Sequence, residues 1–139
     1  MTQHIREIMT SDPVTVDPQT PVVEVARRMR EEHIGDVLVT EGDRLRGLVT
    51  DRDLVVRVLA EGENISGKTV QEAVSGDLAS VSPDDDIDRA VQLMREHSVR
   101  RLPVVEDDHP VGIVSLGDLA IERDPGSALG DISKAAPNP

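Results

Sequence analysis

An internal repeat is the feature that most constrains what this chain can fold into. Shifted by 65 positions, the sequence matches itself without a gap. Met29-Arg30-Glu31 falls on Met94-Arg95-Glu96, and Val16-Asp17-Pro18 falls on Val81-Ser82-Pro83. Self-similarity at a fixed period is typical of a chain that builds one supersecondary unit more than once. The sequence therefore predicts two copies of one small unit rather than a single continuous core.

Both copies predict the same order of elements. In the first, a short strand at Thr15–Val16 precedes a helix over Pro21–Glu32, where apolar residues recur at helical spacing. Two apolar strands flank a polar turn and predict a hairpin, after which a second helix is expected over Arg52–Ala60. The hairpin strands are Asp36–Thr40 and Leu45–Thr50 in the first copy, and Arg101–Val105 and Val111–Ser115 in the second. Each copy is thus a β-α-β-β-α unit of an α+β protein.

The repeat also predicts the domain boundaries. We expect a first domain over residues 1–64 that includes a lead-in helix at Ile5–Met9, and a second domain over residues 65–123. Residues 124–139 contain Pro and Gly and have no partner in the repeat, so they predict a flexible C-terminal tail. Within that tail, Ala128–Ile132 is the segment that can dock back.

Composition excludes several classes of function. The net charge of −12 argues against nucleic acid and against anionic membranes, because both are bound chiefly through Lys and Arg. The absence of Phe, Tyr and Trp excludes the stacking of bases on aromatic rings, and the absence of Cys excludes disulfides and thiolate metal sites. We expect a cytoplasmic protein, since no signal peptide or membrane-spanning run is present. A core without aromatic rings also favours dimerisation.

A motif closes the hairpin of each copy, and it carries a family resemblance. Gly47-Leu48-Val49-Thr50-Asp51-Arg52-Asp53 corresponds to Gly112-Ile113-Val114-Ser115-Leu116-Gly117-Asp118. A β-α-β-β-α unit with this ending resembles the CBS domain, named after cystathionine β-synthase, and the chain is similar to the small stand-alone CBS pairs of actinobacteria. The resemblance implies two CBS domains packed through their sheets in pseudo-twofold symmetry. It also implies an adenosine-type ligand in the cleft between them, and a homodimer in which four CBS domains form a disc.

The motif residues suit a ribose. A ribose presents two neighbouring hydroxyl donors, and an ionised carboxylate accepts both. Asp53 and Asp118 stand where a helix begins, and a hydroxyl, Thr50 or Ser115, precedes each by three residues. The same residue types are ordinary helix caps, so capping is the competing interpretation.

Phosphate binding needs cations in so acidic a chain. Arg100 and Arg101 precede the second hairpin, where the resemblance places a phosphate, and Arg binds phosphate with a bidentate fork. Arg52 is the corresponding candidate in the first copy. There, however, Gly35-Asp36 replaces the two arginines, and Asp36 would repel a phosphate. We therefore favour the site around Asp118.

The adenine is expected to meet strand backbone and aliphatic walls. The residues predicted for this role are Thr15, Val16, Ser80, Val81, Val37, Leu102 and Pro103. The four His have no metal-ligand spacing, and no metal site is predicted.

Taken together, these observations predict a regulatory sensor, not an enzyme, because no nucleophile motif is present. An adenine nucleotide such as AMP, ADP or ATP would be its regulatory ligand, with no cofactor required. We expect it to act on a protein partner that the sequence does not identify, and the resemblance suggests a role in stress. The alternative is a ligand-free interaction dimer with the same fold.

Overall fold

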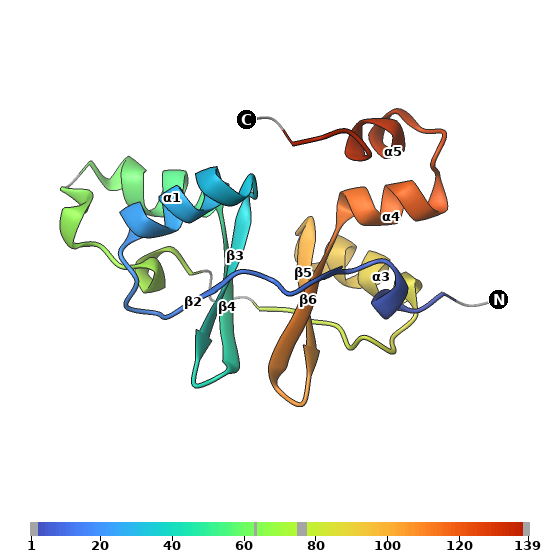
Figure 1. Cartoon of the computed structure of the whole chain (residues 1–139), viewed down its shortest axis with the longest axis horizontal. Coiled ribbons are helices and arrows are strands. Elements are labelled where there is room, and N and C mark those ends of the chain that lie inside the picture. The colour runs from blue at the N-terminus through green and yellow to red at the C-terminus, as the bar shows by residue number, and fades with distance from the viewer. Residues whose placement is uncertain (1–2, 63, 75–77, 138–139) are drawn as a thin grey trace. The chain divides into compact units, whose positions relative to one another are not determined.

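The two copies fold as two units in the computed structural model, which describes residues 3–62, 64–74 and 78–137. The first-copy unit comprises Val14–Leu78. The second-copy unit joins the segment that ends at Pro13 to Ala79–Ala136 (Figure 1). Each unit has its own sheet and its own apolar core, so the predicted α+β class with two repeated units is confirmed.

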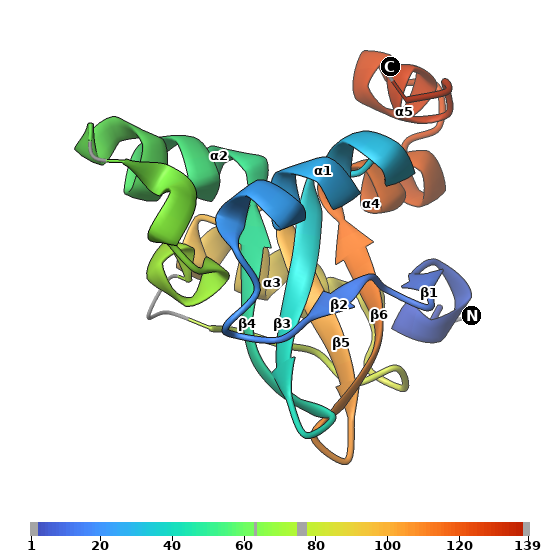
Figure 2. The ribbon, with the colours of Figure 1, turned by 60° about the vertical axis from the view of Figure 1, so that its left-hand side comes forward.

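The first-copy unit is built on a three-stranded sheet. Strand β3 (Asp36–Glu41) pairs in parallel with β2 (Thr15–Val16) and antiparallel with β4 (Arg44–Thr50), as Figure 2 shows. The hairpin turns at Gly42 and Asp43, whose φ angles of +58° and +67° form the tight two-residue turn that suits the twist of the strands. Helix α1 (Val22–Glu32) covers the sheet and buries its apolar positions at helical spacing.

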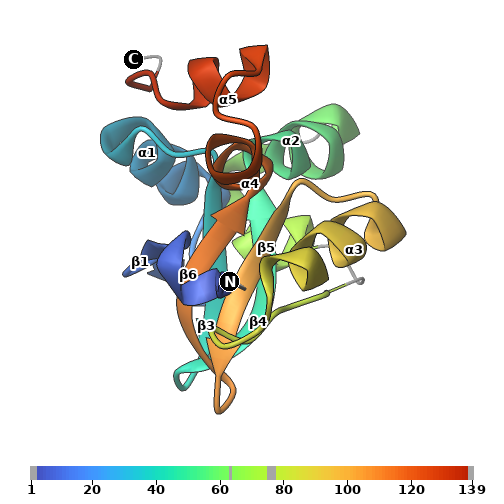
Figure 3. The same cartoon turned by 90° about the vertical axis from the view of Figure 1, so that its right-hand side faces the viewer.

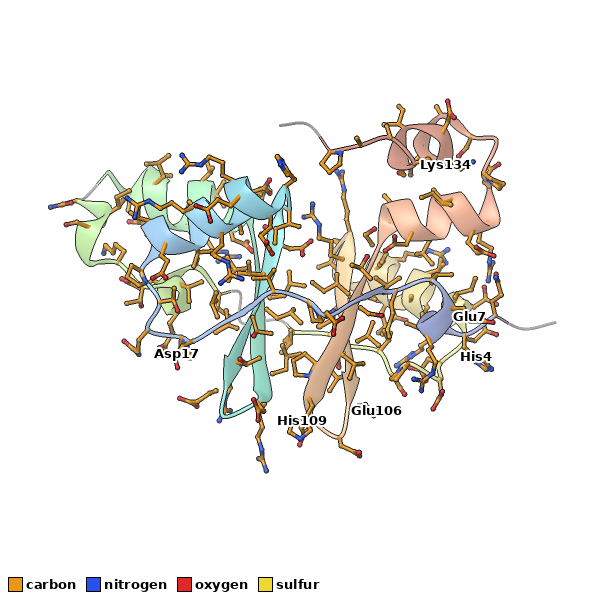
Figure 4. The ribbon with its side chains drawn as sticks, in the orientation of Figure 1. His4, Glu7, Asp17, Glu106, His109 and Lys134 are labelled. Carbon is orange, nitrogen blue, oxygen red and sulfur yellow. The ribbon has the colours of Figure 1, made fainter. Side chains whose placement is uncertain are left out.

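In the second-copy unit the same plan recurs. Strand β5 (Arg101–Glu106) pairs with β6 (His109–Ser115), and Val81 bridges to β5 in the parallel sense. Glu106 and His109 flank the tight turn of this hairpin (Figure 4). A further strand, β1 (Thr10–Ser11), lies along the outer edge of β6 (Figure 3). The helices of this unit are α3 (Ile87–His97), α4 (Leu116–Arg123) and α5 (Ala128–Ser133).

The lead-in segments are exchanged between the copies. The 3₁₀-helix η1 (Ile5–Glu7) packs in the second-copy unit, where the backbone N–H of Ile5 donates to Asp85 and the side chain of Ile5 is 0% exposed. The 3₁₀-helix η5 (Val70–Ala73) packs in the first-copy unit, where the N–H of Val70 donates to Thr20 and the side chain of Val70 is 0% exposed.

This exchange corrects the predicted domain boundaries. The first core is completed by a segment beyond residue 64, and the second core is completed by the first residues of the chain. The prediction was wrong because it assigned each lead-in helix to the copy that follows it in the sequence. A repeat shows that two segments are equivalent, but it does not say which core each segment covers.

The second helices of the two copies differ. The first copy runs through α2 (Asp51–Asp53), a π-helical stretch η2 (Leu54–Val58) and a 3₁₀ turn η3 (Leu59–Glu61), whereas the second has the regular helix α4. Between η3 and η5 lies one more 3₁₀ turn, η4 (Ile65–Gly67). The predicted docking segment in the tail is helix α5, which lies over α4. No helix in the described part of the chain has the length and apolar character to cross a membrane.

Candidate functional site

Both motifs end in the same local structure, a reciprocal helix cap. In the first copy the Thr50 N–H donates to Asp53 Oδ2 at 2.9 Å, and the Asp53 N–H donates to Thr50 Oγ1 at 3.1 Å. In the second, the Ser115 N–H donates to Asp118 Oδ2 at 2.8 Å, and the Asp118 N–H donates to Ser115 Oγ at 3.1 Å. The capping interpretation is therefore confirmed at both positions, and one oxygen of each carboxylate is used by the cap.

The second carboxylate oxygen distinguishes the two copies. Asp53 Oδ1 accepts from Arg57 Nε at 3.3 Å, and the Asp53 side chain is only 14% exposed. Among the described residues, nothing donates to Asp118 Oδ1. The repeat places Glu122 where Arg57 stands, and that carboxylate accepts from the side chain of Gln3 instead. Asp118 Oδ1 therefore accepts no hydrogen bond from the described residues, whereas Asp53 Oδ1 accepts one from Arg57.

Arg57 was not among the residues predicted for the site, although the sequence contains a signal for it. Asp53 and Arg57 are four residues apart, the spacing at which helical side chains meet. An acid followed four residues later by a base, at a motif position, is reason to expect an ion pair.

The strand register brings the predicted phosphate-binding arginines to the second cap. Arg101 lies opposite Ser115 across β5 and β6, and the carbonyl of Arg100 accepts from the N–H of Leu116 at 2.8 Å. The Arg100 side chain is exposed and that of Arg101 is half-buried. The backbone positions of Arg100 and Arg101 therefore lie beside the Ser115 and Asp118 cap, at one end of the sheet of the second-copy unit.

In the first copy, the same place in the sheet has different chemistry. Asp36 lies opposite Thr50, and the carbonyl of Gly35 accepts from the N–H of Asp51 at 2.9 Å. Arg52 is exposed in the first turn of the helix. Asp36 and Arg101 are equivalent positions in the repeat. They also occupy equivalent positions in the strand register of the two hairpins. This end of the first-copy unit carries more negative charge.

The motif glycines serve the lead-in segments. A Cβ on Gly112 would stand 2.7 Å from the sulfur of Met9 and 2.8 Å from the carbonyl oxygen of Thr10. A Cβ on Gly47 would stand 2.5 Å from Val74 Cγ1. Met9 and Val74 are equivalent in the repeat. Glycine is therefore needed so that the exchanged segment can approach the strand.

Most of the predicted adenine contacts belong to the core. The side chains of Val37 and Leu102 are 0% and 1% exposed. Val81 uses both main-chain groups in the sheet, since its N–H donates to Pro103 at 3.1 Å and its carbonyl accepts from Val105 at 2.8 Å. Val16 and Pro103 are also buried, whereas Thr15 and Ser80 are exposed.

Four of these side chains, those of Val16, Val37, Val81 and Leu102, are members of the apolar cores. An apolar strand residue at a motif position looks the same in the sequence whether it lines a wall or fills a core, so the aliphatic wall stays a prediction. Of the predicted adenine contacts, only Thr15 and Ser80 keep exposed positions. Within the described residues, no group of three or more His, Asp or Glu side chains forms a metal site.

The family of the chain follows from comparison with known proteins. The model of the CBS domain family matches residues 5–60 and again residues 70–123. The chain belongs to the CBS domain family and carries two copies of the domain, which confirms the resemblance seen in the motifs.

Particular relatives are of similar length. CBS domain-containing protein YhcV of Bacillus subtilis (strain 168) is 40% identical over 93% of this chain and 94% of its own. Hypoxic response protein 1 of Mycobacterium tuberculosis is 34% identical over 83% of this chain and 81% of its own. A crystal structure of hypoxic response protein I, which holds two coordinated zinc ions, has a TM-score of 0.78 and 33% identity over 86% of this chain and 98% of that one.

A third comparison concerns a structure with ligands. The CBS domain pair of protein MJ0100, solved in complex with 5′-methylthioadenosine and S-adenosyl-L-methionine, has a TM-score of 0.78. It is 22% identical and covers 86% of this chain and 94% of that one. At this level of identity the likeness shows a shared fold.

Proposed function

We propose that the chain is a regulatory module that binds an adenine nucleotide or a related adenosyl ligand at the capped start of α4. The observation that carries the proposal is Asp118. Its Oδ2 holds the helix cap, while its Oδ1 has no donor among the described residues. An ionised carboxylate oxygen at a helix start, beside a hydroxyl and two arginines, suits a polyhydroxyl ligand that carries negative charge.

Each part of such a ligand has a counterpart in the second-copy unit. The ribose hydroxyls would donate to Asp118 Oδ1, and a phosphate would meet the guanidinium groups of Arg100 and Arg101 and the first turn of α4. The exposed Ser80 would offer main-chain groups to the base. That MJ0100 holds adenosyl ligands in this fold is consistent with the proposal.

The first-copy unit is proposed as the weaker site. Asp53 is held by Arg57, and Asp36 stands where Arg101 does in the other unit. A ligand there would have to displace an ion pair before it met a carboxylate, and its phosphate would face an acid. Arg52 is the one predicted cation that remains at this position.

Isothermal titration of the purified chain with AMP, ADP, ATP and S-adenosylmethionine tests the proposal. The variants are Asp118→Asn and Asp53→Asn, which keep one amide oxygen for the cap while removing the charge. Because a hydrogen bond to a charged group is worth about 1.5–3 kcal/mol, Asp118→Asn should weaken binding roughly 10- to 100-fold. Asp53→Asn is expected to change the same affinity little. No heat with any of the four ligands, in a folded wild-type chain, would refute the proposal.

A second candidate function, an interaction dimer that needs no ligand, is favoured by exposed apolar side chains. Val55, Val56 and Leu59 on the second helix of the first copy are 52%, 41% and 59% exposed. Exposed apolar groups gathered on one helix favour association. We propose a homodimer that uses this helix, and sedimentation velocity on the titration samples measures it. A stable dimer that takes up no nucleotide would support this second function over the first.

A further inference from the structure

The C-terminal helix α5 lies directly on α4. A Cβ on Gly130 would stand 2.6 Å from the carbonyl oxygen of Asp124 and 3.1 Å from that of Ala120. At the other end of the contact, a Cβ on Gly117 would stand 2.8 Å from Ser133 Oγ. The two helices therefore approach closely through residues with small side chains or none, and Figure 3 shows α5 above α4.

Few strong contacts hold α5 in place. The Ser127 hydroxyl donates to the carbonyl of Asp124 at 2.7 Å and accepts from the N–H of Gly130 at 3.0 Å, and Lys134 Nζ reaches the carbonyl of Pro125 at 3.4 Å. Lys134 is labelled at the end of α5 in Figure 4. The larger apolar side chains of this helix, Leu129 and Ile132, are 44% and 70% exposed. A helix that buries so little apolar surface opens at low free energy.

Its last turn rests beside the candidate site. Ser133 Oγ and Ser115 Oγ both lie within 3.6 Å of the point that a Cβ on Gly117 would occupy. Gly117 itself stands between Ser115 and Asp118, the two residues of the cap. A ligand phosphate that approaches the first turn of α4 past Gly117 would thus meet the space that Ser133 fills.

The first copy has a different residue at the corresponding position. The repeat places Arg52 where Gly117 stands, and Arg52 is exposed. The close approach of Ser133 to Gly117 depends on a residue without a side chain, and the first copy does not have one there. The match to the CBS domain model ends at residue 123, so α5 lies outside the two matched domains.

We propose that α5 is a lid that covers the first turn of α4 and competes with the adenosyl ligand for it. This inference rests on the proposed function and adds its regulation: the second-copy site binds tightly only when α5 has moved away. The closed lid lowers the apparent affinity by the fraction of molecules in which the site is open. A partner that captures the exposed Leu129 and Ile132 would open the site.

The substitution Gly130→Val tests the lid without touching any residue of the site. Its side chain would collide with main-chain oxygens, which have no rotamer to change, so α5 must lift. Gly126→Val is the matched control, since no atom beyond its chain neighbours lies within 4 Å of that Cβ. Titration with ATP should show binding to Gly130→Val about tenfold tighter than to wild type, if the lid is open in about a tenth of the molecules. Gly126→Val should bind as wild type does.

Further variants separate the possible failures. Ser127→Ala removes the cap of α5 and should raise the affinity in the same direction, and it decides the question if Gly130→Val does not fold. In the double variant Asp118→Asn with Gly130→Val, ATP should bind about tenfold tighter than to Asp118→Asn alone, because the closed lid scales the apparent affinity whatever the affinity of the open site. The absence of that gain would overturn the lid. Equal ATP affinities of wild type, Gly130→Val and Ser127→Ala would also overturn it, with the proposed function intact. No binding by any of them would refute both.

Discussion

The motifs that close the two hairpins have the same helix cap, but the helices that follow differ within one turn. Both have a hydroxyl and a carboxylate that cap each other, at distances equal to within 0.1 Å. Four residues after the Asp, the first copy has Arg57 and the second has Glu122. The cap builds the fold, so both copies keep it. The positions around the cap decide what chemistry remains for a ligand, and there the copies are free to differ.

The helix that follows shows the same division. In the first copy it contains a π-helical stretch, Leu54–Val58, and exposes apolar side chains. In the second copy it is a regular helix on which Gly117 and Ala120 leave room for α5. The repeat places Arg52 and Val55 at those two positions. One copy therefore has a helix that a partner can cover, and the other has a helix that is already covered.

The largest expected effect comes from cutting the chain between the copies. A fragment of residues 14–78 keeps every member of the first core, whereas a fragment of residues 1–64 lacks the fully buried Val70 and Ala73. Burial of a Val side chain alone contributes about 1.5–3 kcal/mol, and a domain this small cannot spare the loss of both residues. We expect a cooperative thermal transition by circular dichroism for 14–78 and none for 1–64. A cooperative transition in both fragments would contradict the exchange of lead-in segments.

An intermediate effect is expected at the motif glycines. Gly112→Ala would push a methyl group into the main chain of Thr10, whereas Gly47→Ala would meet the side chain of Val74, which can rotate. Overpacking of this kind costs about 1–3 kcal/mol, and we expect Gly112→Ala to be the more damaging. Chemical denaturation measures both, with Gly67→Ala as the control in open space. If Gly112→Ala is as stable as that control, the close approach of the lead-in segment is refuted.

The smallest effect concerns the pH dependence of one lead-in segment. The N–H of Thr69 donates to Glu72 at 2.8 Å, Lys68 lies 3.4 Å from it, and both contacts lower the pKa of the Glu72 carboxyl from its ordinary 4.5. A carboxyl whose pKa is lower in the folded state stabilises that state above its unfolded pKa. This contribution is lost as the pH falls through the folded pKa.

The variant Glu72→Gln should therefore melt slightly below wild type at pH 7, and the difference should shrink as the pH falls below about 4.5. Glu31→Gln, on α1, is the matched control for the loss of one negative charge. Melting curves recorded between pH 7 and pH 3 make the comparison. A gap between wild type and Glu72→Gln that stays constant with pH would show that the ion pair and the cap do not act through ionisation.

Much of this molecule could be predicted because the relevant interactions are local. The helix that contains Val22, Val25 and Met29 follows from spacing alone, and the hairpin turn follows from Gly42 beside a polar residue. The caps at Asp53 and Asp118 join residues three apart, so capping was among the expected outcomes. Arg101, one of the residues predicted for phosphate, lies opposite Ser115 across the hairpin.

Which apolar residues are buried could not be predicted from local sequence patterns. Val37 and Leu102 carried the same apolar signal as any residue of a ligand-facing wall, and only the packed core shows that they face inward. The side chain of Gln3 donates to Glu122, which is 119 residues away in the sequence, and no motif predicts this contact. Such pairs depend on which segments the folded chain brings together.

By itself, the sequence determined that this protein has two copies of one unit, what elements each copy contains, and where each motif places a hydroxyl and a carboxylate. These are properties of residues within a few positions of one another, where periodicity and capping act. Tertiary structure alone decided that each lead-in segment completes the core of the other copy and that α5 rests on α4. It also decided that no described residue donates to Asp118 Oδ1. Each of these features depends on which segments pack together so that apolar surface is buried and polar groups are paired in three dimensions. The order of residues along the chain does not predict that packing.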